Sequence, residues 1–297
     1  FTSDRNHWLK SSVMRSVQAP RMIVSTDLDG TLLDHFSYSW QAARPAMEKL
    51  ASLGIPVILN SSKTYAEIRA LQEQLGLSGP FIVENGSALF LPVDDFAWLL
   101  TTQPADQAVI QVDGYLQVVF GAQRATIIDY IGELRRQHGW DFEGFNDWTI
   151  AQIMTYTGLD EESASQAADK MFSEPIQWND SEPNLSSFTK QLKTRKLSLL
   201  KGGRFYHVQG QTDKSRPLLW LQALYTSKTD ATPPLVCLGD SENDIQMLNV
   251  ADHPVCIRSP VSDFPVLQSD KPVIKTTAYG PAGWNEAINA ILSTELQ

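Results

Sequence analysis

Two carboxylates stand two positions apart near the N-terminus, directly after a short apolar run. The run Met22–Thr26 leads into Asp27-Leu28-Asp29-Gly30-Thr31. Side chains at positions i and i+2 of a loop after a strand can face one cavity. There, one carboxylate can attack a phosphorus atom while the other donates and accepts protons. Gly30 permits the sharp turn, and an acidic turn without chemistry is the alternative for this segment.

Two further segments could handle a phosphate group. In Asn60-Ser61-Ser62-Lys63-Thr64, between an apolar run and a helical pattern, the Ser61 hydroxyl and nearby backbone N–H groups can bind phosphate. An ordinary helix cap is the alternative for this segment. Lys214 opens a later helix, where its charge opposes the helix dipole, which indicates a further role. A solvated surface lysine is the alternative for Lys214.

A fourth segment, Gly239–Asp244 with sequence GDSEND, offers several hard oxygen ligands after an apolar run. Carboxylates such as Asp240 and Asp244 suit Mg²⁺ better than zinc. The alternative is an acidic helix N-terminus, where Asp and Glu are favoured without any metal.

Alternating strands and helices place these four segments. The expected strands are 22–26, 55–59, 81–83, 234–238 and 254–257, and the expected helices are 40–53, 65–75, 215–225, 243–248 and 284–292. This order predicts an α/β fold with a parallel, Rossmann-like sheet and right-handed crossovers. Ligands in such sheets bind at the carboxyl ends of the strands. We therefore expect the four segments to meet there.

The middle of the chain shows a different pattern of predicted strands and helices. A strand at 116–120, helices at 125–137, 161–172 and 185–193, an extended run at 176–178 and a strand at 204–208 predict an α+β unit. The expected organisation is an N-terminal arm at 1–20, a core formed by 21–92 and 211–297, and an inserted unit at 93–210.

Composition excludes several classes of protein. The formal net charge is −10, which disfavours DNA, RNA or an anionic membrane surface as a partner. No apolar run reaches 18 residues, and the first 20 residues lack a long apolar stretch, so we expect neither a membrane span nor a secretory signal. Cys237 and Cys256 are the only cysteines and lie in apolar runs, which indicates buried thiols and a reducing cytoplasm.

Taken in order, the four segments resemble the motifs of the haloacid-dehalogenase superfamily of phosphatases, and the insertion resembles the larger α/β cap of that superfamily. The segments SSKTYAEI, IVENGSALF, GGRFYHV and GPAGW are similar to the mannosyl-3-phosphoglycerate phosphatase subfamily. The resemblance spans about residues 22–290 and leaves out the first 20.

The resemblance implies a mechanism. Asp27 would be the nucleophile that forms an aspartyl-phosphate, and Asp29 would protonate the leaving oxygen and then activate water. Ser61 and backbone N–H groups would hold the phosphoryl oxygens, and Lys214 would supply positive charge where the nucleophile and the phosphate approach each other.

The resemblance also implies a Mg²⁺ site. The ion would lie between Asp27, the backbone carbonyl of Asp29 and Asp240. Asp244 would support it directly or through water.

Substrate-binding residues are expected outside these groups, with a structural alternative for most of them. Glu84 and Asn85 would bind sugar hydroxyls or form an ordinary Asn-Gly turn. Arg204 suits a carboxylate such as that of glycerate, and a salt bridge is its alternative. His207 shares a ligand with Arg204 only if the strand twists or bulges, and a structural histidine is its alternative. The full expected set is Lys63, Glu84, Asn85, Arg204, His207 and Asn243, in which Asn243 would orient Asp27 or Lys214.

The function expected from the resemblance is Mg²⁺-dependent hydrolysis of a glycosyl-3-phosphoglycerate. Alternatives are a phosphatase of another sugar phosphate, such as sucrose phosphate, a broad-range phosphatase, a phosphomutase, and a non-catalytic phosphosugar-binding protein. The complete set of acidic residues and Lys214 disfavours the last of these. The expected partner is a small phosphorylated sugar, and the sequence predicts no oligomeric state.

Overall fold

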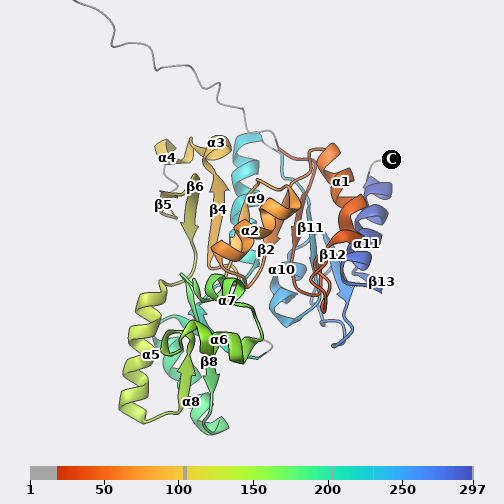
Figure 1. The fold of residues 1–297 in the computed structure, drawn as a ribbon. Coiled ribbons are helices and arrows are strands. Elements are labelled where there is room, and N and C mark those ends of the chain that lie inside the picture. The colour runs from red at the N-terminus through yellow and green to blue at the C-terminus, as the bar shows by residue number, and fades with distance from the viewer. Residues whose placement is uncertain (1–18, 103–105, 202–203, 230, 296–297) are drawn as a thin grey trace, which may run out of the picture.

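The computed structural model describes residues 19–102, 106–201, 204–229 and 231–295 (Figure 1). The expected N-terminal arm at 1–20 therefore lies almost entirely outside the described residues, as do Gly202 and Gly203 of the GGRFYHV segment. No helix in the described ranges is both long and apolar enough to span a membrane.

A nine-stranded sheet with the order β13-β12-β11-β1-β2-β3-β4-β6-β5 forms the larger part of the molecule. The six strands from β13 to β3 pair in parallel, and β4, β6 and β5 are added by antiparallel pairing. The predicted α/β fold with a parallel sheet is confirmed. The strands are β1 (Ile23–Thr26), β2 (Val57–Asn60), β3 (Phe81–Val83), β4 (Ala88–Pro92), β5 (Val109–Val112), β6 (Tyr115–Val119), β11 (Leu235–Gly239), β12 (His253–Arg258) and β13 (Ile274–Tyr279).

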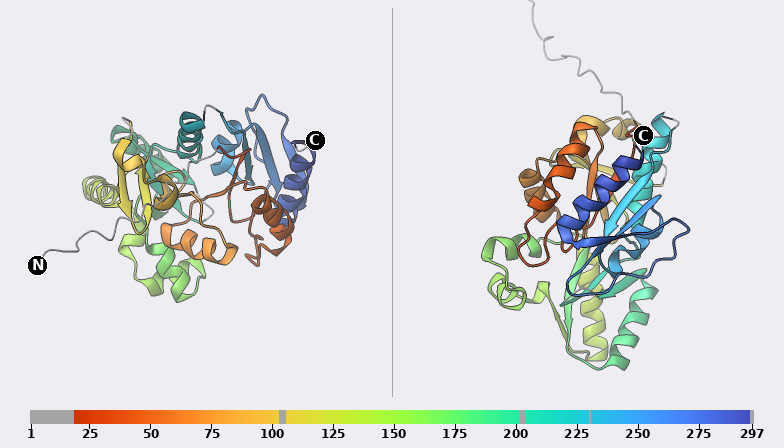
Figure 2. Two further views of the ribbon diagram at one scale, coloured as in Figure 1. Left: turned by 90° about the horizontal axis from the view of Figure 1, so that it is seen from above. Right: turned by 90° about the vertical axis from the view of Figure 1, so that its right-hand side faces the viewer.

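Helices cover both faces of this sheet (Figure 2). Strand β1 is buried along its whole length, with Ile23 in one apolar cluster and Val24 in the other. Burial on both faces explains why the parallel strands are continuous apolar runs rather than alternating ones. The elements are η1 (Gln41–Ala43), α1 (Arg44–Ser52), α2 (Tyr65–Leu75), α3 (Val93–Phe96), α4 (Leu99–Thr102), α9 (Ser215–Thr229), η3 (Glu242–Asp244), α10 (Ile245–Asn249) and α11 (Gly280–Glu295).

A second, antiparallel sheet with the order β7-β8-β10-β9 lies below the large one in Figure 1. Its strands are β7 (Phe142–Gly144), β8 (Ser173–Trp178), β9 (Leu197–Lys201) and β10 (Tyr206–Gly210). Helices α5 and α8 pack on this sheet around Ile131, Phe188 and Val208. The helices of this part are α5 (Arg124–His138), η2 (Phe145–Asp147), α6 (Ile150–Thr157), α7 (Glu161–Ala168) and α8 (Glu182–Thr194).

The pairing of β5 and β6 differs from the expectation that 93–210 forms one inserted unit. Strand β6 pairs with β4 over Tyr115–Val119, so residues up to 119 belong to the large sheet. A strand pattern shows that residues 116–120 are extended but does not show which sheet they join. The part with its own sheet begins after β6 and ends at Gly210, and we call it the insert below.

Candidate active site

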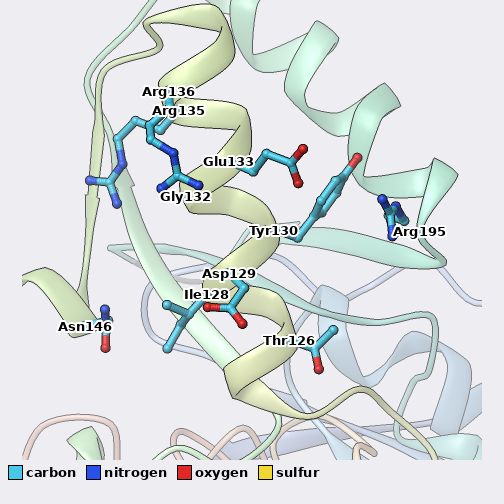
Figure 3. A pocket seen from close by; sticks show the side chains of 10 residues that line it. All are labelled: Thr126, Ile128, Asp129, Tyr130, Gly132, Glu133, Arg135, Arg136, Asn146 and Arg195. Atoms are coloured by element: carbon cyan, nitrogen blue, oxygen red, sulfur yellow. The ribbon is translucent and has the colours of Figure 1, made fainter.

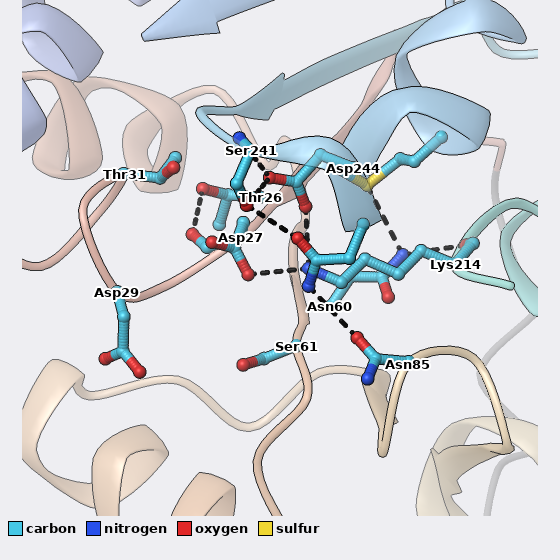
Figure 4. A network of polar contacts seen from close by, with 12 residues as sticks. Thr26, Asp27, Asp29, Thr31, Asn60, Ser61, Asn85, Lys214, Ser241 and Asp244 are labelled. Atoms are coloured by element: carbon cyan, nitrogen blue, oxygen red, sulfur yellow. Dashed lines mark hydrogen bonds and ion pairs between the residues drawn. The ribbon is translucent and has the colours of Figure 1, made fainter. Parts of the chain in front are cut away.

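Loops at one edge of the large sheet bring the predicted acidic and phosphate-binding residues together. Asp27 follows β1, Ser61 follows β2, Asp240 follows β11, and Lys214 directly precedes α9. Figure 4 shows Asp27 and Lys214 joined in one polar network, with the side chain of Ser61 nearby. Asp240 lies beside Asp27 in the same cluster of carboxylates. The parallel pairing of β1 with β2 and β11 explains this, because the carboxyl ends of parallel strands share one edge.

Lys214 is the centre of this network and is fully buried. Its Nζ lies 2.6 Å from Asp27 Oδ1 and 2.7 Å from Asp244 Oδ1. Burial alone would lower the pKa of Lys214, but the two carboxylates outweigh it and raise that pKa well above its usual value. Lys214 is therefore a permanent cation, and the surface-lysine alternative is wrong.

Three buried carboxylates surround this single cation. Ligand oxygens of Asp27, Asp240 and Asp244 all lie within 4.8 Å of one another. Burial and the neighbouring acids raise the pKa of Asp27 to about 8 and that of Asp240 to about 7. This arrangement leaves negative charge unbalanced, and its hard oxygen donors could bind a divalent metal ion.

Close packing of the first and fourth motifs depends on Gly30. Its φ of +82° is in the left-handed region, and a Cβ there would stand 2.7 Å from Asp240 Oδ2. Thr31 Oγ1 donates to Asp240 Oδ1 over 3.1 Å, and the backbone N–H of Asp240 donates to Asp244 Oδ2 over 3.1 Å. Thr31 was not among the predicted site residues, although its place directly after Gly30 in the first motif is the signal that could have found it.

Asp29 stands apart from the three clustered carboxylates. Its Oδ2 lies 3.0 Å from Lys63 Nζ, and Glu67 lies 3.9 Å from the same ammonium group. The two carboxylates of the first motif both line one solvent-accessible cavity but have different surroundings, because Asp27 is buried beside Lys214 and Asp29 is exposed beside Lys63.

This cavity has a volume of about 490 Å³ and lies between the motifs and the insert. The insert contributes Leu200, Lys201 and His207, and the motif loops contribute Asp27, Asp29, Ser61, Ser62, Asn85, Asp240, Ser241, Glu242 and Asn243. His35, Val261 and Ser262 also line it. These three residues were not predicted. His35 lies just beyond the first motif, and no pattern in the sequence indicates the other two.

Asn85 and Asn243 meet at the cavity wall, where Asn243 Nδ2 donates to Asn85 Oδ1 over 3.1 Å. Glu84 does not line the cavity. It is fully buried, and its carboxylate accepts hydrogen bonds from the backbone N–H groups of Met171 and Phe172 and from Ser173 Oγ. Glu84 was expected to bind a sugar hydroxyl, but in the structure its carboxylate binds the insert.

Arg204 also lies away from the cavity. Its Nη1 donates to the carbonyl oxygens of Tyr156 and Thr157 over 3.0 and 2.8 Å. The last carbonyl groups of a helix have no partner inside the helix, so a guanidinium group at the end of α6 satisfies them. The structure therefore does not bring Arg204 and His207 to one ligand.

Another cavity, of about 570 Å³, lies on the insert along α5 (Figure 3). Its charged lining mixes arginines with acids, and Arg135 is paired with Asp147 at 3.1 Å. None of the residues of the four motifs lines this cavity. Its position excludes it as the place where the motif residues act.

Comparison with known proteins agrees with this geometry. A family model of haloacid dehalogenase-like hydrolases matches residues 24–111. A glucosyl-3-phosphoglycerate/mannosyl-3-phosphoglycerate phosphatase from Methanococcoides burtonii is 33% identical over 271 residues, which cover 90% of this chain and 95% of that protein.

Solved structures share the fold at low sequence identity. A haloalkanoate-superfamily phosphatase from Bacteroides thetaiotaomicron has a TM-score of 0.61 and 18% identity, with coverage of 96% of this chain and 99% of that one. A sucrose-phosphatase from Synechocystis, in complex with sucrose and phosphate, has a TM-score of 0.57 and 15% identity, with coverage of 93% and 98%.

The chain belongs to the haloacid dehalogenase-like hydrolases. Within that family it is a phosphatase, and it is similar over most of its length to a phosphatase of glycosyl-3-phosphoglycerates.

Proposed function

We propose that this phosphatase removes the phosphate of a glycosyl-3-phosphoglycerate through an aspartyl-phosphate on Asp27, with Mg²⁺ as cofactor. The observation that carries the substrate class is the relative from Methanococcoides burtonii, which aligns with 90% of the chain at 33% identity. The cavity supports it, because about 490 Å³ enclosed by both the motif loops and the insert can hold a sugar together with a phosphorylated acid.

Asp27 is the proposed nucleophile. One of its carboxylate oxygens forms a bond to phosphorus while the bond from phosphorus to the ester oxygen breaks. Lys214, 2.6 Å from Asp27 Oδ1, fixes the orientation of this carboxylate and offsets the repulsion between it and the incoming phosphate. Ser61 and the backbone N–H groups that follow it bind the phosphoryl oxygens.

Asp29 is the proposed proton donor and acceptor. It protonates the leaving sugar-acid oxygen and later takes a proton from the water that hydrolyses the aspartyl-phosphate. Asp29 Oδ2 lies 3.0 Å from Lys63 Nζ, so this contact must open before Asp29 can reach the leaving oxygen. The substrate phosphate provides a competing anion for Lys63, which makes Lys63 part of the substrate site.

The three carboxylates and the backbone carbonyl of Asp29 would hold Mg²⁺. Their donor chemistry fits, since Asp27, Asp240 and Asp244 offer three carboxylate oxygens within 4.8 Å, and Lys214 is the one cation paired with them in the described part of the chain. A bound Mg²⁺ supplies positive charge where two anions must approach each other.

The test is release of inorganic phosphate from a panel of esters, before and after removal of metal with EDTA. The panel holds mannosyl- and glucosyl-3-phosphoglycerate, sucrose phosphate, 3-phosphoglycerate and p-nitrophenyl phosphate. We expect at least about 100-fold higher kcat/KM for one glycosyl-3-phosphoglycerate, or about 3 kcal/mol of transition-state binding. We also expect activity to be lost with EDTA and restored by Mg²⁺.

Equal activity on all esters would refute the substrate class and leave a broad-range phosphatase. Full activity after removal of metal would refute the proposed cofactor. Trapping of labelled phosphate on the wild type, but not on Asp27→Asn, tests the aspartyl-phosphate independently of both.

A further inference from the structure

His207 faces the cavity that the motif residues line. It lies on β10 directly opposite Leu200 of β9, and both residues line the cavity. Residues directly opposite each other in an antiparallel pair share one face of the sheet, so this face of the insert points toward the motif loops. Within the described ranges, the imidazole of His207 accepts and donates no hydrogen bond. A polar ring turned to a cavity in this way is free to bind a ligand.

Lys170 places a positive charge at Ser62, another residue that lines this cavity. It lies between α7 and β8, and its Nζ donates to the carbonyl oxygen of Ser62 over 3.0 Å. An ammonium group has three N–H donors, and no described carboxylate forms an ion pair with this one. Burial and, to a lesser extent, the Lys170 charge lower the pKa of His207 to about 3, in keeping with an ammonium group near a neutral imidazole.

The position of Lys170 relative to the phosphate-binding loop is fixed by the fold. Glu84 binds the backbone of Met171 and Phe172, the residues that follow Lys170. Thr64 Oγ1 donates to the carbonyl oxygen of Gln166 over 2.8 Å on the other side. The ammonium group is thus held at the carbonyl of Ser62, next to Ser61 in the phosphate-binding loop. A second anionic group of a substrate bound there would lie on the side of Lys170.

Two of the other lysines near the cavity form ion pairs, and the third lies on a strand next to the helix-covered side of the insert. Lys214 lies between two carboxylates, and Lys63 is paired with Asp29. Lys201 lines the cavity too, but it stands opposite Tyr206, which packs against the cluster under α5 and α8. Strand alternation places Lys201 on the helix-covered side of β9, although its side chain still lines the cavity. Lys170 meets the cavity wall at Ser62, and its side chain also lines a second cavity of about 390 Å³.

We propose that Lys170 and His207 form the site that binds a carboxylate of the leaving group, and that they are specificity-determining residues of this phosphatase. The ammonium group gives a charge-assisted hydrogen bond, and the neutral imidazole adds an N–H donor. The matching substrate is a phosphate ester whose leaving group has a carboxylate a few bonds from the ester oxygen. This inference rests on the proposed function. It assigns to Lys170 the carboxylate-binding role that was expected of Arg204.

The experiment compares two substrates that differ only in the carboxylate. One is glucosyl-3-phosphoglycerate, and the other is its analogue with the carboxylate reduced to a hydroxymethyl group. For Lys170→Met, we expect kcat/KM to fall about 30-fold on the acid and less than about threefold on the analogue, because the analogue makes no charge-assisted hydrogen bond there. Lys170→Arg restores most of the preference for the acid, and His207→Leu loses about 10-fold on the acid alone.

Lys190→Met, at an exposed lysine of α8, is the matched control and should leave the ratio of the two activities unchanged. Loss of the ratio in Lys201→Met, with the ratio intact in Lys170→Met, would overturn the assignment. Equal losses on both substrates would show that Lys170 only holds the Ser62 loop, which also contradicts the proposal. Activity on the analogue shows that each variant is folded.

A second pair of substrates distinguishes a failure of the carboxylate site from a failure of the proposed function. If neither glycosylated ester is hydrolysed, 3-phosphoglycerate and glycerol 3-phosphate replace them, since they differ by the same carboxylate. A preference for 3-phosphoglycerate that disappears in Lys170→Met would support the carboxylate site although the glycosylated substrate is wrong. A wild type without any preference in either pair would refute the carboxylate site.

Discussion

The buried pairing of Asp27 with Lys214 is the residue-scale feature on which the proposed chemistry depends. Lys214 is fully enclosed and holds two carboxylates at 2.6 and 2.7 Å, so its ammonium group has a fixed position. A lysine at the start of an exposed helix would have neither the burial nor the partners. The same contacts keep Asp27 pointed at the cavity.

Replacing Asp27 with Asn should abolish phosphate release. An amide oxygen is a far weaker nucleophile than a carboxylate, so we expect kcat to fall at least about 1000-fold. The measurement is phosphate release with Mg²⁺ present, and Asp270→Asn is the control because Asp270 is an exposed acid far along the chain from the motifs. More than about a tenth of wild-type activity in Asp27→Asn would exclude Asp27 as the nucleophile.

His207 should make stability depend on pH. Burial lowers its pKa in the folded protein to about 3, whereas the unfolded chain has a value of about 6.5. Between these values the unfolded state binds more protons, so stability is complete above about pH 6.5 and is lost as the pH falls. From pH 7.5 to pH 5 the loss due to this group is up to about 2 kcal/mol.

Urea unfolding of the wild type and of His207→Gln at the two pH values measures how much His207 contributes to the pH dependence of the free energy of unfolding. We expect the wild type to lose up to about 2 kcal/mol more than the variant, which does not titrate in that range. Parallel pH dependences of the two proteins would contradict it.

At the scale of elements, a tight turn after β3 positions Lys214. Gly86 has a φ of +83°, and a Cβ there would stand 1.9 Å from the carbonyl oxygen of Asp213 and 2.8 Å from the backbone nitrogen of Lys214. Thr212 Oγ1 donates to the carbonyl oxygen of Gly86 over 2.9 Å. The turn and the start of α9 are therefore in backbone contact, and a change in one must move the other.

Gly86→Ala should damage both stability and activity. The left-handed φ and the steric conflict together cost about 2–4 kcal/mol, and displacement of Lys214 should lower kcat at least about 10-fold. Gly76→Ala is the matched control, because Gly76 has a φ of +67° at the end of α2 and no atom within 4 Å of the added Cβ. It should cost about 1 kcal/mol and leave kcat unchanged. Equal kcat values for both variants would show that the turn does not position Lys214.

At the scale of the whole molecule, Glu84 joins the large sheet to the insert. Its buried carboxylate accepts two backbone N–H groups and the Ser173 hydroxyl from the segment that leads into β8. Glu84 itself has a φ of +47°, and its neighbour Asn85 faces the cavity. This contact sets where the insert lies over the motif loops, which is why it matters for a site built from both parts.

Replacing Glu84 with Leu should loosen the insert. Two backbone N–H groups and a hydroxyl lose their acceptor, and buried donors without partners cost about 1–3 kcal/mol each. We expect faster amide exchange at Met171 and Phe172, and a larger loss of kcat/KM on a glycosylated ester than on p-nitrophenyl phosphate. Glu182→Leu, at an exposed acid of α8, is the control. Unchanged exchange at both amides would contradict the joining role.

The sequence by itself determined the fold class and the order of the four motifs. Alternating strands and helices predicted the parallel sheet, and this sheet requires the loops after β1, β2 and β11 to share one edge. The physical reason is local, since apolar periodicity and the residue types at strand ends need no knowledge of distant contacts. The meeting of Asp27, Asp240 and Lys214 follows from that pattern.

Only the tertiary structure decided which residues face the cavity. Glu84 and Arg204 have suitable chemistry for a substrate, but Glu84 binds the insert and Arg204 binds the end of α6. The pairing of β6 with β4 likewise assigned residues 115–119 to the large sheet. Side chains choose partners among everything the fold brings near them, and such contacts between distant segments leave no periodic signal in the chain.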